Sequence, residues 1–305
     1  MVVSTQIIYR GRFAPSPTGY LHFGSLVTAL GSFLQAKSNR GEWLVRMEDL
    51  DLTRNQAGAA DDILFTLEAC GLQWDGAVLY QTTRNEIYFE ILNLLKDHTF
   101  LCACSRKELQ YNQGLYDGKC RHGIPFGKTP RTVRLKVPDQ TISFQDLIQG
   151  SFQQNLVKEV GDFVLKRADG CYAYQLAVVI DDAMQHITEI VRGCDLLDST
   201  PRQLYLQSLL NYPKPKYAHL PIITNALGQK LSKQTLAQPI DKKKPLPALF
   251  EALQYLGHPP PLELLNENVE ILLQWAISNW QLSNIPRTFA QSKLDLSMIY
   301  QEKCE

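Results

Sequence analysis

The chain has 305 residues, 45% of them hydrophobic, and its 31 Lys and Arg balance its 31 Asp and Glu. This length suggests two domains, and the ordinary content of Gly and Pro excludes a collagen-like or largely disordered chain. No apolar run approaches the roughly 18 residues of a membrane span, and the N-terminus lacks a signal-peptide pattern. We therefore expect a soluble, cytoplasmic protein that contacts no membrane.

The first part of the chain alternates strand-like and helix-like patterns, as a nucleotide-binding α/β domain does. Residues 7–13 predict a short strand, which a Pro-rich turn at 15–19 ends. Apolar residues at helical spacing from Leu21 to Leu34 predict a helix that ends near Asn39. The next predicted elements are a strand at 42–47 and helices around 63–67 and 87–95.

The pattern changes between residues 100 and 170, where cysteines, glycines and short β-like runs at 132–137 and 162–166 predict an inserted module. Residues 174–180 and 187–191 then predict two strands that return to the main sheet. The last predicted elements are a strand at 220–223 and helices at about 247–256 and 269–280. We expect three regions: a core of residues 1–99 and 171–240, an inserted acceptor-type module of residues 100–170, and a short helical C-terminal region of residues 241–305.

The turn between the first strand and the first helix is a candidate nucleotide site. It presents backbone N–H groups and the positive end of a helix to an anion. His22 can donate to phosphate oxygens, and Gly24 allows close approach to the backbone. Taken alone, the segment fits a purely structural turn equally well.

Two lysines of a later loop strengthen this interpretation. Lys230 and Lys233 lie in Lys-Leu-Ser-Lys-Gln, after the predicted strand at 220–223. Ammonium groups on such a loop neutralise charge that builds on a phosphate in a transition state. A solvated loop is the usual explanation for such a pair by itself, but the two motifs in this order are specific.

With both motifs the chain resembles the class I aminoacyl-tRNA synthetases, whose signatures are H-I-G-H and K-M-S-K-S. The opening Arg-Phe-Ala-Pro-Ser-Pro-Thr-Gly resembles the glutamyl branch. Ser25 stands where the first signature ends in His, and Leu231 and Gln234 vary the second. The resemblance implies a Rossmann-type catalytic core, ATP with Mg²⁺ as co-substrate, His22, Lys230 and Lys233 as catalytic groups, and His22, Gly24, Ser25 and Lys233 as ATP contacts.

An amino acid with two carboxylates and an ammonium group calls for guanidinium groups and acceptors, because unpaired charge away from water is costly. The candidates are Arg12 beside the first motif, Glu48 at a strand end and Arg192 in Val-Arg-Gly. Each of them, taken alone, is more often part of a surface ion pair.

The resemblance to glutamyl-tRNA synthetases gives these residues roles. It implies that Arg12 and Glu48 bind the main-chain end of glutamate and that Arg192 binds its side-chain carboxylate. A bidentate guanidinium favours glutamate over glutamine. The implied reaction is attack of the glutamate carboxylate on the α-phosphate of ATP, which gives glutamyl-adenylate and pyrophosphate. The full set of implied glutamate contacts is Arg12, Phe13, Ala14, Pro15, Ser16, Glu48, Tyr174 and Arg192.

The inserted module carries a candidate metal site. Cys102, Cys104 and Cys120 suit Zn²⁺, and a fourth ligand is needed to close a structural site. Spacing alone favours His122, and free buried thiols are the alternative. The segment 115–121 resembles a subgroup of glutamyl-synthetase-like proteins in which a Tyr is the fourth ligand, which implies Tyr116. The remaining cysteines are expected to be inert: Cys70, Cys171, Cys194 and Cys304.

The short C-terminal part, the cysteine module and the His-x-Gly-Ser variant together resemble the glutamyl-queuosine tRNA(Asp) synthetases. That family activates glutamate without tRNA and transfers it to queuosine at the wobble position of tRNA(Asp). A compact chain of this length has a radius of gyration of about 19 Å, so we expect it to hold only one end of a tRNA. The resemblance implies that this end is the anticodon stem-loop, and we expect the protein to be a monomer. The alternatives are a truncated glutamyl-tRNA synthetase that charges the 3′ end and a non-catalytic tRNA-binding paralogue.

Overall fold

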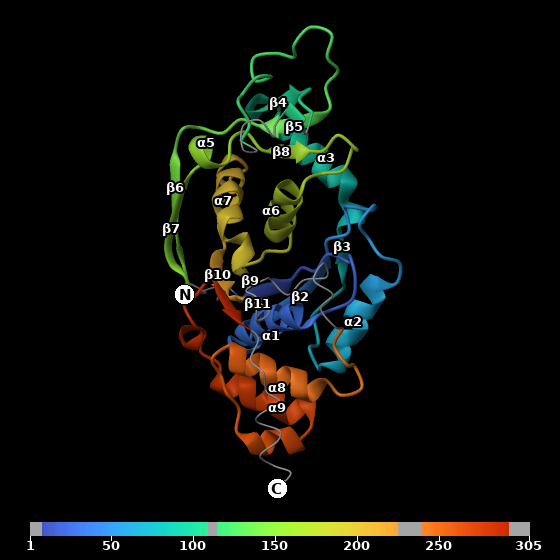
Figure 1. The fold of residues 1–305 in the computed structure, drawn as a ribbon, viewed down its shortest axis with the longest axis vertical. Helices are drawn as coiled ribbons and strands as arrows, with labels where there is room; N and C mark the ends of the chain where they lie inside the picture. Colours follow the sequence, from blue (N-terminus) through green and yellow to red (C-terminus); the bar gives the residue numbers. More distant parts are fainter. Residues whose placement is uncertain (1–7, 106, 109–114, 225–238, 293–305) are drawn as a thin grey trace, which may run out of the picture.

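A computed structural model describes residues 8–105, 107–108, 115–224 and 239–292 (Figure 1). Its first unit is a strand, a helix and a parallel strand: β1 (Arg10–Phe13), α1 (Phe23–Ser38) and β2 (Glu42–Met47). Strand β3 (Leu79–Tyr80) lies on the other side of β2. The predicted strand at 42–47 and the predicted helix after Leu21 are confirmed, since Leu26, Leu30 and Leu34 are fully buried on α1.

A second sheet, which contains another parallel pair, lies beside the first. Strands β9 (Glu189–Gly193) and β10 (Lys216–Leu220) run parallel, with Arg192 opposite His219. The Thr188 amide donates to the Arg10 carbonyl at 2.9 Å, which places β9 beside β1. The carboxyl ends of parallel strands meet at one edge of a sheet, where α/β proteins bind ligands. The candidate residues that follow β1 and β2 therefore lie near the end of β9 that carries Arg192.

The segment 174–180, expected as a strand, is the start of helix α6 (Tyr174–Met184), so that prediction was wrong. Residues 176–182 are all buried, and a helix buried on every face loses the polar stripe that reveals helical periodicity. Its short apolar run with two valines and an isoleucine therefore looks like a buried strand. The other returning strand, expected at 187–191, is confirmed as β9.

The region expected as an inserted module is divided between two sheets. Strands β4 (Thr99–Cys102), β5 (Thr132–Leu135) and β8 (Val164–Lys166) form a separate antiparallel sheet at the top of Figure 1. The hairpin of β6 (Thr141–Asp146) and β7 (Gly150–Asn155) instead joins the core, because β6 pairs with β10. The boundaries of the three expected regions therefore stay a proposal.

Helices α8 (Pro245–Tyr255) and α9 (Val269–Asn279) lie below α1 in Figure 1 and share its hydrophobic core. The other described helices are α2 (Ala59–Ala69), α3 (Asn85–Leu94), α5 (Leu156–Glu159) and α7 (Thr200–Leu209), and the short strands β11 (Ile222–Thr224) and β12 (Ala290–Ser292) pair in parallel. None of the helices that the structure describes combines the length and apolar character needed to cross a membrane.

Candidate active site

His22 caps the N-terminus of α1. Its Nδ1 accepts from the Ser25 amide at 3.3 Å, and its Nε2 lies 3.0 Å from the Ser25 hydroxyl. Ser25, which departs from the family signature, therefore orients the imidazole. The described first turn of α1 carries no acidic side chain, so the positive end of the helix dipole is not neutralised there. Gly24 lies in the same turn, and the arrangement suits a phosphate group.

Two of the expected catalytic residues, Lys230 and Lys233, lie outside the described residues. Two described residues farther along the chain, Pro239 and Ile240, lie beside the first motif. The Ile240 amide donates to the Leu21 carbonyl at 3.1 Å, and Pro239 forms an antiparallel bridge with His22. The first described residues after the lysine motif, Pro239 and Ile240, thus lie against the proposed phosphate site.

Arg12 is buried and paired with a carboxylate that comes from α6. Its Nε lies 3.0 Å from Asp182 Oδ1, and its NH2 lies 3.5 Å from Asp182 Oδ2. Arg46 of β2 donates to the same Asp182 oxygen at 2.8 Å. Burial raises the pKa of Asp182, but Arg12 and Arg46 outweigh burial and hold it below its ordinary value. Asp182 thus fixes two guanidinium groups at the ends of β1 and β2.

Glu48 follows β2, and its carboxylate lies 3.6 Å from Arg46 NH2 with the side chain 11% exposed. Its Oε1 is buried and makes no hydrogen bond to any residue that the structure describes. Burial raises the pKa of Glu48 to about 7, although Arg46 and Arg12 oppose this shift. A buried acceptor without a hydrogen bond is costly, so this oxygen is a candidate acceptor for a ligand donor.

The turn after β1 brings the remaining first-motif residues close to Glu48. The Glu48 amide donates to the Pro15 carbonyl at 2.9 Å, and the Ser16 carbonyl accepts from Thr18 at 2.8 Å. Ala14 is half-buried and Ser16 is exposed. The Phe13 side chain belongs to the core, where it stacks on Trp43 with ring centroids 6.3 Å apart. Any ligand contact of Phe13 is therefore restricted to its backbone.

Arg192 is 3% exposed, and all five of its N–H groups donate to neutral acceptors. The shorter bonds run from Nε to His219 Nε2 at 3.0 Å, from NH1 to Gln203 Oε1 at 2.8 Å and from NH2 to Thr200 Oγ1 at 2.9 Å. The longer bonds run from NH1 to the Tyr174 hydroxyl at 3.4 Å and from NH2 to the Leu196 carbonyl at 3.3 Å. Among the described residues no carboxylate forms an ion pair with Arg192.

Tyr174 connects the two parts of the site. It begins α6 and accepts from Arg192, while Asp182, near the end of the same helix, holds Arg12. Burial raises the pKa of the Tyr174 hydroxyl. The charges of Arg192 and Arg12 lower this pKa, and the charge of Glu48 raises it. The structure therefore brings the expected glutamate residues of β1, β2, α6 and β9 around one centre.

Four residues of this site were not predicted from the sequence: Arg46, Asp182, His219 and Asp146. Arg46 lies in the same short segment as Glu48, and Asp182 lies in the same segment as Tyr174. The charged residues of these two segments could therefore have been proposed from the sequence as parts of the site. His219 and Asp146 lie in strands that only the sheet register brings to Arg192.

The three sulfur atoms of Cys102, Cys104 and Cys120 lie within 4.8 Å of one another. The Cys104 and Cys120 sulfurs are 3.7 Å apart, close to the roughly 3.8 Å expected for two thiolates on tetrahedral zinc with bonds of about 2.3 Å. The Tyr116 hydroxyl is buried with them and accepts from the Cys120 amide at 2.7 Å. His122 is exposed and does not belong to the cluster.

The other described cysteines lie apart from this cluster. Cys70 and Cys194 are buried, and burial raises the pKa of each thiol to about 12, which is consistent with inert side chains. Cys171 is half-buried, and Cys304 lies outside the described residues.

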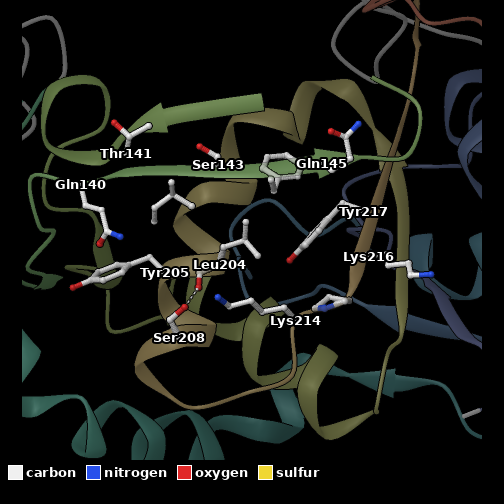
Figure 2. A pocket seen from close by; sticks show the side chains of 13 residues that line it. Gln140, Thr141, Ser143, Gln145, Leu204, Tyr205, Ser208, Lys214, Lys216 and Tyr217 are labelled. Atoms are coloured by element: carbon white, nitrogen blue, oxygen red, sulfur yellow. Dashed lines mark hydrogen bonds between the residues drawn. The ribbon is translucent and has the colours of Figure 1, made fainter. Parts of the chain in front are cut away.

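A cavity of about 560 Å³ lies between β6 and α7, and Figure 2 shows the side chains that line it. None of the expected site residues lines this cavity. Tyr217 on its wall also lies under the Arg192 guanidinium, whose Cζ is 5.2 Å from the ring centroid. The cavity is therefore behind the candidate site, and Tyr217 separates the two.

Comparisons with known proteins identify the family of this chain. A family model for the catalytic domain of class I tRNA synthetases (E and Q) matches residues 9–263. The glutamyl-Q tRNA(Asp) synthetase of Thiobacillus denitrificans is 53% identical over 284 residues, which cover 90% of this chain and 94% of that protein. The protein of the same name from Pseudomonas fluorescens is 48% identical over 299 residues, which cover 97% and 100%.

Solved structures give the same result for the fold. A glutamate tRNA ligase from Elizabethkingia meningosepticum, solved in complex with its amino acid, matches with a TM-score of 0.79 and 25% identity over 95% of this chain and 67% of that one. The chain belongs to the class I tRNA synthetases of the glutamate and glutamine branch, and within it to the family of the glutamyl-Q tRNA(Asp) synthetases.

Proposed function

We propose that this protein activates glutamate with ATP and transfers it to queuosine in the anticodon of tRNA(Asp). The observation that carries the first step is the buried Arg192, whose five donors meet only neutral acceptors among the described residues. A buried positive charge without a counterion is unfavourable unless a ligand supplies one. The names of the similar proteins, glutamyl-Q tRNA(Asp) synthetase, support the second step.

The geometry of Arg192 favours a carboxylate over an amide. Each terminal nitrogen has one short and one long hydrogen bond, and the long ones go to Tyr174 and Leu196. A carboxylate that replaces these two weak acceptors binds both nitrogens in parallel and supplies the missing negative charge. The amide of glutamine brings N–H donors toward N–H donors, so glutamate is favoured.

The other end of glutamate lies between the first two strands. Ionised Glu48 attracts the α-ammonium group, and its buried Oε1 gains a donor. Arg12, fixed by Asp182, faces the α-carboxylate, which attacks the α-phosphate of ATP as the bond to pyrophosphate breaks. The ligands gather close to the N-terminus of α1, where His22, together with Lys230 and Lys233, stabilises the phosphate charge. Mg²⁺ bound to ATP supplies further charge neutralisation.

The cysteine cluster is proposed to hold one structural Zn²⁺ through Cys102, Cys104, Cys120 and Tyr116. The sulfur separations fit tetrahedral coordination, and the Tyr116 oxygen lies within the cluster. Arg134 lies 4.3 Å from the Tyr116 ring centroid, and its positive charge favours the ionised ligands. The metal would tie the loop around Cys120 to the end of β4, since a closed four-ligand site supplies folding energy rather than chemistry.

Glutamate-dependent ATP–pyrophosphate exchange tests the activation step. We expect exchange without tRNA, and we expect Arg192→Ala to abolish it at ordinary glutamate concentrations. Arg10→Ala is the matched control, because Arg10 lies in β1 but forms a partly exposed pair with Glu42. Unchanged glutamate affinity in Arg192→Ala contradicts the proposed site, and a complete absence of exchange in the wild type indicates a non-catalytic paralogue.

Labelled glutamate tests the transfer step. tRNA(Asp) with queuosine, without queuosine and with an oxidised 3′ end is incubated with enzyme and ATP. We expect label that requires queuosine and is indifferent to oxidation of the 3′ end. Label on tRNA that lacks queuosine, lost on oxidation, indicates a glutamyl-tRNA synthetase instead.

A further inference from the structure

Two buried residues of neighbouring strands stand behind Arg192. His219 on β10 is fully buried, and its Nε2 lies 3.0 Å from Arg192 Nε. Its Nδ1 lies 2.6 Å from Oδ2 of Asp146, which ends β6 and is 1% exposed. The three side chains therefore form a line from carboxylate to imidazole to guanidinium.

The hydrogen-bonding chemistry fixes the tautomer of His219. Arg192 Nε–H can only donate, so the Nε2 atom of His219 must carry a lone pair. The proton is then on Nδ1 and is donated to Asp146. The Thr200 hydroxyl, 3.4 Å from the same Nε2, can donate its hydrogen to it while accepting from Arg192 NH2.

Asp146 is itself held by the backbone. Its Oδ1 accepts from the amides of Ile148 at 3.0 Å, Gln149 at 2.8 Å and His219 at 3.2 Å. These donors leave Oδ2 for the imidazole and prevent the carboxylate from rotating. They also hold the pKa of Asp146 below its ordinary value together with His219, against the opposing effect of burial.

The groups that face His219 keep it neutral. Burial lowers its pKa, and the positive Arg192 of β9 lowers it further, while Asp146 of β6 and Asp195, which follows β9, oppose this shift. Thr200 of α7 and the Tyr217 ring of β10 are uncharged neighbours. The imidazole therefore remains an acceptor toward Arg192 at neutral pH.

The imidazole keeps two opposite charges apart. A direct Asp146–Arg192 pair would occupy the guanidinium with a carboxylate of the protein, which competes with the carboxylate of a substrate. With His219 between them, Nε is bound by a neutral imidazole, and the two terminal nitrogens have neutral acceptors, the weaker of which are Tyr174 and Leu196.

We propose that Asp146 and His219 are positioning residues that orient Arg192 toward the side-chain carboxylate of glutamate and prevent Arg192 from pairing with an acid of the protein. This inference rests on the proposed function, in which Arg192 binds that carboxylate.

Asp146→Asn is the sharpest test of the tautomer. The Asn oxygen can still accept from the backbone amides, so its NH₂ group faces Nδ1 of His219 and forces the proton onto Nε2. An N–H of His219 then meets the N–H of Arg192. We expect the KM for glutamate to rise about 10- to 100-fold, as for a lost hydrogen bond to a charged group, with the KM for ATP nearly unchanged. An unchanged glutamate KM overturns the proposal.

Two substitutions of His219 separate positioning from packing. In His219→Gln the side-chain oxygen can accept from Arg192 and the NH₂ group can donate to Asp146, so we expect a glutamate KM within about threefold of the wild type. His219→Leu has similar bulk but no acceptor, and we expect the same large rise as in Asp146→Asn. If His219 had only a packing role, each of the two variants would change the KM for glutamate and the KM for ATP to the same extent. That result would contradict the proposal.

A measurement on the unchanged protein needs no variant to fold. ¹⁵N NMR of the His219 imidazole is expected to show the neutral form with the proton on Nδ1 at pH 7, and a proton on Nε2 overturns the proposal. The Arg192→Ala variant distinguishes the two levels of inference. If Arg192→Ala leaves the glutamate KM unchanged, the proposed function fails. If Arg192→Ala raises the glutamate KM but Asp146→Asn and His219→Leu do not, only the positioning role of Asp146 and His219 fails.

Discussion

At the residue scale, the charge of Glu48 makes glutamate binding depend on pH. Burial raises the pKa of Glu48 to about 7, and only the ionised carboxylate attracts the α-ammonium group of the substrate. We therefore expect kcat/KM for glutamate to be level above about pH 7 and to fall about tenfold per pH unit below it. Pyrophosphate exchange measured from about pH 5.5 to about 8.5 tests this profile.

Glu48→Gln is the control for this profile, because it keeps the size of the side chain and removes its titration. The variant is expected to have a low kcat/KM for glutamate that no longer falls below about pH 7. If kcat/KM of the variant still falls there, another group is responsible for the pH dependence.

Protein stability gives an independent check. The pKa of Glu48 is higher in the folded protein than the ordinary 4.5, so its contribution to the free energy of unfolding decreases as pH rises from about 4.5 to about 7.

The residues of the site differ in how far the sequence could reveal them. Arg12, Glu48 and Arg192 lie in motifs whose residue types match an amino acid with two carboxylates and an ammonium group, so the sequence alone proposes them as ligand contacts, and that role stays a prediction. His219 and Asp146 were not, because they lie 27 and 73 residues from their partners along the chain. Spacing along a chain does not give the register between strands, which alone brings these side chains together.

At the element scale, α6 shows why one prediction was wrong and what the error concealed. Its apolar residues pack on more than one side, so the polar face that identifies a helix is missing. As a helix, it directs Tyr174 at one end toward Arg192 and Asp182 at the other toward Arg12. A strand of the same length would alternate its side chains across the sheet and could not contact both arginines in this way.

The cysteine module gives a prediction at the same scale. Tyr116→Phe removes only the hydroxyl that accepts from the Cys120 amide, whereas His122→Ala changes an exposed ring. We expect the purified wild type to contain about one zinc per chain, Tyr116→Phe to bind it much more weakly, and His122→Ala to retain it. Zinc content by atomic emission, followed during titration with a chelator, measures both effects.

If Tyr116→Phe retains zinc and His122→Ala loses it, the fourth ligand is His122. Zinc retained in both variants, but lost in Cys104→Ser, would leave the three thiolates with water as the fourth ligand. The cysteines and their spacing made this site predictable, but the fourth ligand was left open by spacing because the loop conformation decides which nearby side chain turns inward.

At the scale of the whole molecule, the C-terminal helices share one hydrophobic core with α1 and the first sheet. Trp280, directly after α9, is 8% exposed and stacks on His258 with ring centroids 4.5 Å apart. Its Nε1 donates to Gln35 of α1 at 2.7 Å, and Gln35 donates at 2.7 Å to Glu189 of β9. A line of buried hydrogen bonds thus runs from the C-terminal region through α1 to the strand that carries Arg192.

This continuity predicts a single unfolding transition. In urea, the loss of pyrophosphate-exchange activity and the loss of far-UV circular dichroism are expected at the same midpoint, because the C-terminal helices and the sheet share one core. Trp280→Ala should lower the free energy of unfolding by about 3–5 kcal/mol and move both midpoints together, whereas Trp280→Phe, which loses mainly the bond to Gln35, should cost about 1 kcal/mol. If Trp280→Ala shifts the circular dichroism transition and leaves the activity transition in place, the C-terminal helices are an independent unit and the shared core does not couple them to the active site.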